Sequence, residues 1–193
     1  MVTPTLYHAY VDGSAYDQHK KYGAGGIILN SQNNLGSTAF SQPLYGEHSS
    51  FTAELYAAVH ALNILPAGSR VKIHSDFKKL CRQIRQRRLE QWANQERRPE
   101  NIRACKDLFN AAARHESVKA AYAIDRKCQK TQTAHKLAQA AALNRNIDLK
   151  KALRSAKTGR STKQETEKGN KKQQRRRAVQ ESLAQTSAYR QAI

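Results

Sequence analysis

The amino-acid sequence predicts an α/β domain with a mixed sheet, followed by a basic extension. Residues 5–42 contain segments rich in β-formers, and from Ser50 apolar side chains recur at helical spacing. After about Arg145 large apolar side chains become scarce. A chain of 193 residues, 39% of them hydrophobic, can bury one ordinary core. We therefore expect a domain at residues 1–145 and an extension at 146–193.

Three β-strands are expected before Ser50. Residues 5–14 alternate polar and apolar side chains, residues 23–30 run apolar, and a third short strand is expected near 35–42. The second run begins with glycines, which indicate a bulge or a close packing contact; these are Gly23, Gly25 and Gly26. We expect these strands to form an antiparallel sheet joined by hairpins.

A helix is expected from Ser50, because the apolar period changes there. One helical face carries Phe51, Leu55, Ala58, Val59 and Leu62. Pro66-Ala67-Gly68 ends this helix. Val71 and Ile73 then alternate with polar residues in a short central strand that ends at Ser75-Asp76.

The second half of the domain repeats this alternation of helix and strand. We expect a helix from near Asp76, a second over 101–114, a strand over 118–124 and a closing helix around 134–141. The full order is three strands, a helix, a strand, two helices, a strand and a helix. This order is that of an α/β sandwich.

The charge of the chain indicates a polyanionic partner. Lysine and arginine number 34 against 15 aspartates and glutamates, which gives a net charge of +19 and a pI near 10.2. This excess is far larger than solubility needs, so nucleic acid is the first partner to consider. Residues 154–177 are rich in charge and almost free of large apolar side chains, which favours disorder or transient helix until an anion binds.

Several other classes are disfavoured by the sequence. No run of eighteen apolar residues occurs and the N-terminus is polar, so neither a membrane span nor a secretory signal is expected. Cys81, Cys105 and Cys128 have no CxxC spacing, which disfavours a zinc site. Their use as isolated, buried small residues is typical of a reducing compartment, and we expect a cytoplasmic location.

Three carboxylates occupy positions suited to a divalent cation. Asp12 ends a strand and precedes Gly13, Glu54 lies one turn into a helix, and Asp76 ends the central strand. Each has a commoner use when it occurs alone: a turn, a solvated helix residue and a helix N-cap, respectively. Their order on these element types favours a metal site.

The ordered motifs resemble those of the ribonuclease H family. The resemblance covers residues 5–142 and rests on five segments. They are Asp12-Gly13-Ser14, Tyr22-Gly23-Ala24-Gly25-Gly26, Thr52-Ala53-Glu54-Leu55, His74-Ser75-Asp76 and Ala134-His135-Lys136-Leu137-Ala138, the last resembling the family's closing Ala-Asp-x-Leu-Ala. The resemblance implies a mixed five-stranded sheet flanked by helices, and an endonuclease that cuts the RNA strand of RNA–DNA hybrids. It also implies two Mg²⁺ or Mn²⁺ ions, with Asp12 bridging both and with Glu54 and Asp76 completing the ligand set.

His135 departs from the family pattern, because it stands where a fourth carboxylate is expected. An imidazole removes one negative charge and offers nitrogen, which Mn²⁺ accepts better than Mg²⁺. One interpretation keeps His135 as a metal ligand and catalytic residue, and another makes the chain a weakly active or inactive scaffold that binds nucleic acid. A third has Asp125 reaching the metals while His135 shuttles protons, although pairing of Asp125 with a neighbouring basic residue is the commoner arrangement.

Basic clusters supply candidate nucleic-acid contacts. The first, which resembles the basic protrusion of some ribonucleases H, comprises Lys78, Lys79, Arg82, Arg85, Arg87 and Arg88. Trp92 follows it and either stacks on a substrate or packs in the domain. Backbone near Gly13 and Ser14 is expected to contact 2′-hydroxyl groups. The run Arg175-Arg176-Arg177 is expected to anchor nucleic acid, with a localisation signal or a protein-binding arm as alternatives.

Overall fold

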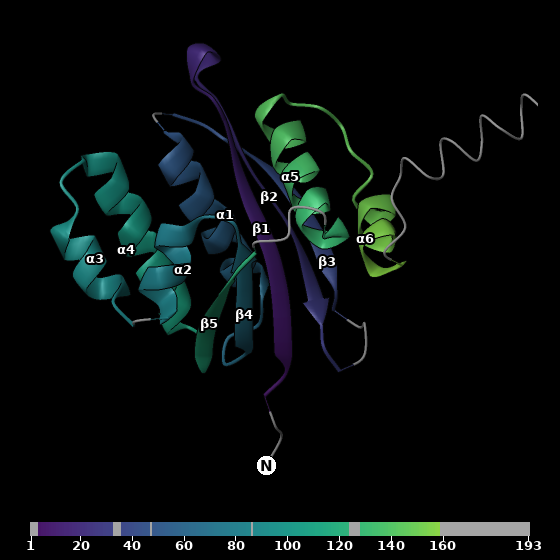
Figure 1. Cartoon of the computed structure of the whole chain (residues 1–193), viewed down its shortest axis with the longest axis horizontal. Helices are drawn as coiled ribbons and strands as arrows, with labels where there is room; N and C mark the ends of the chain where they lie inside the picture. The colour runs from purple at the N-terminus through teal and green to yellow at the C-terminus, as the bar shows by residue number, and fades with distance from the viewer. Residues whose placement is uncertain (1–3, 33–35, 47, 86, 124–127, 159–193) are drawn as a thin grey trace, which may run out of the picture. The chain divides into compact units, whose positions relative to one another are not determined.

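The computed structural model describes residues 4–32, 36–46, 48–85, 87–123 and 128–158. Its centre is a five-stranded sheet in the order β3-β2-β1-β4-β5 (Figure 1). The strands are β1 (Leu6–Tyr16), β2 (Lys21–Asn30), β3 (Thr38–Leu44), β4 (Arg70–Ser75) and β5 (Ser117–Tyr122). A short 3₁₀ turn, η1 (Asp17–His19), joins the first two strands.

The sheet is mixed, as the sequence predicted. β1 pairs antiparallel with β2 and β2 with β3, which confirms the expected hairpins. β4 pairs parallel with β1, and β5 pairs parallel with β4. Tyr10 lies opposite His74 in the parallel pair. Asp12 and Asp76 each follow two residues later, so the register brings both to the same edge of the sheet.

Helices cover both faces of the sheet (Figure 1). Four lie on one side of the sheet: α1 (Ser50–Ile64) and α2 (Lys78–Arg85) against the strands, and α3 (Leu89–Gln95) and α4 (Pro99–Ala113), which pack on each other, with α4 also against α1. The other face carries α5 (Gln129–Ala142) and α6 (Leu149–Thr158). In the part of the chain that the structure describes, no helix has the length and apolar character needed to cross a membrane.

Two apolar clusters hold these layers together. The larger lies between the sheet and the four-helix layer and includes the fully buried Leu55, Leu62, Ile73 and Leu108. Cys81 and Cys105 are buried there too, as expected of isolated thiols. The smaller cluster joins β2 and β3 to α5 and α6 through Ile27, Ala39, Leu137 and Ala156.

One helix, α3, was not predicted from the sequence, and α6 falls in the extension that was expected to be disordered or helical. α3 is short and follows a basic run, so its apolar pattern is brief. α6 lies where the sequence indicated the basic extension, yet Ala156 is only 1% exposed and packs with Leu137. The compact unit accordingly runs to Lys157. The remaining unit, 158–193, lies outside the described residues apart from Thr158.

Candidate active site

Three carboxylates converge at the edge of the sheet. One oxygen from each of Asp12, Glu54 and Asp76 lies within 4.8 Å of the others. Asp12 comes from β1, Glu54 from α1, and Asp76 from the residue that follows β4. Asp12 is buried, with 5% of its surface exposed. Residues far apart in the sequence are thus assembled as the motif spacing predicted.

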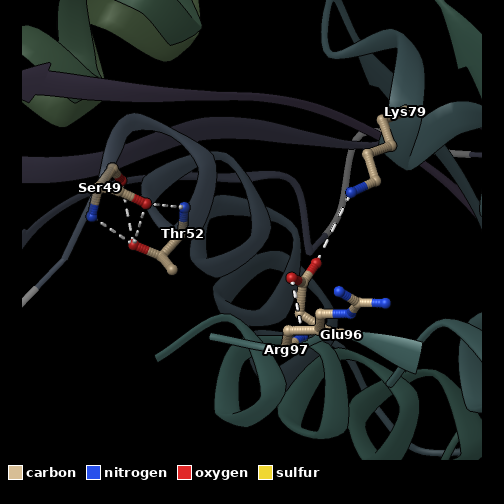
Figure 2. Close-up of polar contacts among 5 residues, drawn as sticks. All are labelled: Ser49, Thr52, Lys79, Glu96 and Arg97. Atoms are coloured by element: carbon tan, nitrogen blue, oxygen red, sulfur yellow. Dashed lines mark hydrogen bonds and ion pairs between the residues drawn. The ribbon is translucent and has the colours of Figure 1, made fainter. Parts of the chain in front are cut away.

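Glu54 owes its position to the start of α1 and to the strand beneath it. Ser49 caps the helix: its hydroxyl accepts a hydrogen bond from the Thr52 backbone at 3.2 Å, and the Ser49 backbone donates to the Thr52 hydroxyl at 2.7 Å (Figure 2). At Gly13 a Cβ atom would lie 2.7 Å from the Glu54 Cα atom. The absence of a side chain at Gly13 therefore lets α1 approach β1 closely.

His135 is positioned by the close contact between α5 and β2. A Cβ atom on Gly25 would overlap the backbone nitrogen of Ala138 and lie 2.6 Å from the carbonyl carbon of Leu137. Because Gly25 is the β2 partner of Asp12, this approach brings α5 over the carboxylates. The Nδ1 atom of His135 lies 2.9 Å from Asp12 Oδ2. The imidazole is half exposed and contacts Asp12 directly.

The site is electrostatically incomplete without a cation. Burial, followed by the charges of Asp12 and Asp76, raises the pKa of Glu54 well above its ordinary value, and a hydrogen bond from the Gly13 backbone opposes this rise. The Oε2 atom of Glu54 is buried and has no hydrogen-bond partner. Three clustered carboxylates with an unsatisfied oxygen fit the ligand preference of a hard divalent ion. The donor set therefore suits Mg²⁺ or Mn²⁺.

We expect Glu54→Gln to stabilise the metal-free protein at neutral pH. Since the folded-state pKa of Glu54 is raised, its contribution to stability is complete below the ordinary carboxyl pKa and is lost as the pH rises through the folded pKa. Glutamine removes this loss. The gain in unfolding free energy is about 1.4 kcal/mol for each unit by which the pKa is raised, and each kcal/mol raises the melting temperature by roughly 2–4 °C. Thermal melts in EDTA between pH 5 and pH 8 measure the difference. Equal melting temperatures across this range would contradict the buried-charge explanation.

A hollow of about 440 Å³ opens around the carboxylates. Besides the expected Asp12, Gly13, Glu54, Asp76 and His135, its lining includes four residues of α5 that the sequence analysis missed, namely Thr131, Gln132, Lys136 and Gln139. Thr131, Gln132 and Gln139 lie three or four residues from His135, and Lys136 lies at the same spacings from Gln132 and Gln139, which was the only sequence signal for them. These side chains form the α5 side of the hollow beside the carboxylates.

The sequence matches the RNase H family model over residues 5–143. The chain belongs to the ribonuclease H family. It is therefore a ribonuclease H-like hydrolase, and its sheet order and helical layers are those of this fold. No curated protein matches the sequence.

Solved structures support the ribonuclease H fold. RNase H1 from the halophilic archaeon Halobacterium salinarum NRC-1 has 16% sequence identity and a TM-score of 0.56, covering 72% of this chain and 98% of its own. LC11-RNase H1, isolated from compost by a metagenomic approach, has 20% identity and a TM-score of 0.56, covering 72% and 96%. LC9-RNase H1, a type 1 RNase H with the type 2 active-site motif, has 17% identity and a TM-score of 0.57, covering 76% of each chain.

The basic cluster of this ribonuclease H chain is largely exposed. Lys78, Arg82, Arg85, Arg87 and Arg88 all have exposed side chains on or next to α2. They are available to phosphates, although the Arg85 Nε atom also donates a hydrogen bond to the Cys81 carbonyl at 3.3 Å. Gly13 lines the hollow around the carboxylates, whereas Ser14 is buried and pairs with Gly23 in the sheet. The Ser14 side chain is therefore not exposed to a substrate.

Trp92 and Lys79 differ from the other predicted contacts. Trp92 is 5% exposed and packs edge-on against Phe51, so the predicted base stacking is wrong and the packing alternative is correct. The Nζ atom of Lys79 lies 4.8 Å from the Phe51 ring centroid and 5.2 Å from that of Trp92. It also lies 3.7 Å from Glu96 Oε2 (Figure 2). Lys79 therefore joins α2 to the layer formed by α1 and α3.

We expect Lys79→Ala to cost stability and Lys78→Ala to cost nucleic-acid affinity. Removing Lys79 loses cation–π contacts and a partly buried ion pair, together about 1 kcal/mol. Its exposed neighbour Lys78 lacks these contacts and makes a matched control. Urea unfolding and fluorescence anisotropy with labelled duplex measure the two effects. If Lys79→Ala weakened binding as much as Lys78→Ala without loss of stability, the structural role would be excluded.

Two predicted groups lie outside the described residues. Asp125 falls in 124–127, so its pairing or its reach to the metals remains a prediction. Arg175-Arg176-Arg177 falls in 159–193, and its role as an anchor is likewise a prediction.

Proposed function

We propose that this chain is an endonuclease that hydrolyses the RNA strand of RNA–DNA hybrids, using two Mg²⁺ or Mn²⁺ ions. The observation that carries the proposal is the set of three carboxylate oxygens within 4.8 Å of one another, supplied by β1, by α1 and by the residue after β4. Family membership supports phosphodiester hydrolysis. LC11-RNase H1, which has 20% identity and a TM-score of 0.54, has been solved with an RNA/DNA hybrid.

Asp12, Glu54 and Asp76 would hold the ions, which supply an activated water and charge stabilisation during in-line displacement. The protein's own part is to fix these three carboxylates in a recess that excludes bulk water around Asp12 and Glu54. Burial together with the neighbouring charges makes Glu54 a ligand that releases its proton when positive charge is nearby. Lys136, which lines the same hollow, supplies positive charge toward the phosphate oxygens.

His135 has a distinct role in this proposal. Its Nδ1 atom is 2.9 Å from Asp12, and its half-exposed ring reaches solvent. It can make a hydrogen bond to Asp12 or offer a nitrogen ligand at the edge of the carboxylate cluster. Since the site has one negative charge fewer than four carboxylates would give, we expect a preference for Mn²⁺ over Mg²⁺.

A cleavage assay tests the proposed function. Labelled RNA–DNA hybrid, double-stranded RNA and double-stranded DNA are incubated with the protein in Mg²⁺, in Mn²⁺ and in EDTA. Cleavage of the RNA strand of the hybrid, with 5′-phosphate and 3′-hydroxyl ends and only with metal present, is expected. Tight binding without cleavage in either metal would reject the enzyme and favour the scaffold.

The scaffold remains a second candidate because of His135 and the charge of the chain. A histidine at the fourth position weakens a cation site, and a net charge of +19 would let the fold bind nucleic acid without cutting it. The three assembled carboxylates and the unsatisfied Glu54 oxygen favour the enzyme, because a scaffold does not need that cluster.

We expect His135→Asp to raise activity in Mg²⁺ by about tenfold or more, within the range by which groups around a metal change activity. A carboxylate restores the missing charge and offers the oxygen ligand that Mg²⁺ prefers. Rates in Mg²⁺ and Mn²⁺ for the wild type and the variant provide the measurement, with His135→Asn as a neutral control. An unchanged ratio between the two metals would show that His135 does not act at the ions.

A further inference from the structure

A second hollow, of about 390 Å³, adjoins the catalytic one. Its polar and aromatic lining consists of His8, Tyr10, Asn30, Ser31, Lys130 and Lys157. None of these six residues lines the catalytic hollow. The two hollows are nevertheless neighbours: Tyr10 precedes Asp12 by two residues of β1, about 7 Å along the strand, and Lys130 directly precedes Thr131.

A stack of rings lies along this second hollow. The rings of Tyr10 and His74 are 4.3 Å apart at an angle of 10°, and those of His74 and His8 are 5.2 Å apart at 23°. The Nδ1 atom of His8 and the Nε2 atom of His74 lie at hydrogen-bond distance, 3.0 Å. All three side chains are partly exposed. Such a row of aromatic and imidazole rings offers a surface on which nucleobases stack.

The charge around these rings is positive. The Lys130 Nζ atom lies 5.3 Å from the Tyr10 ring centroid, and Lys157 is exposed at the hollow. Burial, with the nearby charges of His8, Lys72 and Lys130, lowers the pKa of His74 to about 4. Among the described residues, no carboxylate contributes to the pKa shift of His8 or His74. Burial, followed by the charges of Lys72 and Lys130, also lowers the pKa of His8, so the positive charge beside the rings comes from the lysines.

We propose that this hollow is a subsite for an unpaired nucleotide of the strand that extends beyond the catalytic hollow. Its base would lie against the ring stack and its phosphate near Lys130 and Lys157. The Ser31 hydroxyl, which donates to the Leu6 carbonyl at 2.8 Å, still offers an acceptor to a base edge. A volume of about 390 Å³ is at the small end of ligand pockets and suits one nucleotide rather than a duplex.

The occupant is a nucleic-acid strand because the lysines favour phosphate and the rings favour bases, whereas a simple anion would not need the stack. That this strand belongs to an RNA–DNA hybrid rests on the proposed function. Binding of the unpaired nucleotide does not, because it requires neither metal nor cleavage.

The test compares overhangs by fluorescence anisotropy of the full chain in EDTA. The probes are a blunt RNA–DNA hybrid and the same hybrid with a short single-stranded RNA or DNA overhang at either end. We expect an overhang of at least one kind to tighten wild-type binding by about fivefold or more, the usual value of stacking one base. The double variant Lys130→Glu/Lys157→Glu should lose this gain.

A matched variant controls for net charge. Arg103→Glu/Lys106→Glu changes two exposed residues of α4, on the opposite face of the sheet, by the same total charge (Figure 1). It should weaken all probes alike and keep the overhang gain. If the Lys130 variant does not fold by circular dichroism, Lys157→Glu alone, an exposed substitution, replaces it.

Three outcomes would overturn the subsite. The first is that no overhang tightens binding by the wild type. The second is that the overhang still tightens binding by Lys130→Glu/Lys157→Glu. The third is that this variant loses the same affinity for blunt and overhang probes, and more than the α4 control loses, which would indicate a duplex contact. Absence of cleavage would reject the proposed function without changing these binding results. The two proposals therefore fail separately.

Discussion

We expect Asp12→Asn to reduce hybrid cleavage by about 10³-fold or more. Asp12 belongs to the carboxylate cluster and also contacts His135, so its charge acts on the other metal-ligand candidates and on the imidazole. Metal-assisted charge stabilisation is worth several kcal/mol of activation free energy, and about 4 kcal/mol corresponds to a thousandfold change in rate. Asparagine keeps the shape and can still accept a hydrogen bond from His135. The loss should therefore appear in rate rather than in folding.

Substrate binding distinguishes this explanation from a general defect. In EDTA, Asp12→Asn should bind hybrid at least as tightly as the wild type, because a negative charge near the phosphates is removed. Single-turnover rates in Mn²⁺ and anisotropy in EDTA, measured on the same hybrid, provide the comparison. Cleavage by Asp12→Asn within tenfold of the wild type would show that the carboxylate cluster is not the catalytic centre.

The strands of the domain could be predicted from the sequence because their patterns are local. Val71 and Ile73 alternate with polar residues, and both are buried in β4 as expected. α6 could not be predicted in this way. Its basic residues give the composition of a disordered segment, and burial of Ala156 depends on Leu137 in another helix. A helix that is stabilised mainly by a narrow apolar stripe packed on another helix shows only a weak helical pattern in its own sequence.

The convergence of two metal-ligand candidates could be predicted because their strands lie side by side in a register that the sequence pattern indicates. Asp12 and Asp76 follow registered residues of adjacent parallel strands, so the strand pattern alone brings them together. Trp92 is the opposite case: its position after a basic run allowed both stacking and packing. Only the contact with Phe51, more than 40 residues away in sequence, decides for packing.

The buried carboxylates and the close helix–strand contacts have opposite effects on the stability of the metal-free fold. The cluster of carboxylates is unfavourable for the metal-free fold, because burial and mutual repulsion oppose ionisation. Rigid backbone contacts at Gly13 and Gly25 hold the elements in place despite this cost. The carboxylates are therefore expected to serve activity at a cost in stability, whereas the glycines serve both, because they fix the helices that carry Glu54 and His135.

Gly25→Ala is expected to be strongly destabilising. The added Cβ would overlap the Ala138 nitrogen and lie 2.6 Å from Leu137 C and 2.8 Å from Ala134 O, all of them backbone atoms of α5 that cannot rotate away. Overpacking of this kind costs up to about 3 kcal/mol, which corresponds to roughly 6–12 °C in melting temperature for a chain of this size. α5 would have to move, and the 2.9 Å contact between His135 and Asp12 would lengthen.

Gly68→Ala is the matched control for this change. Gly68 has a φ of +76° and nothing within 4 Å of a built Cβ, so its substitution costs only the strain of the left-handed backbone, about 1–2 kcal/mol. Thermal melts rank the two variants, and cleavage assayed well below both melting temperatures should be reduced in Gly25→Ala alone. If Gly25→Ala melted with Gly68→Ala and kept full activity, α5 would not pack on β2 as closely as described, and His135 would lose its structural link to Asp12.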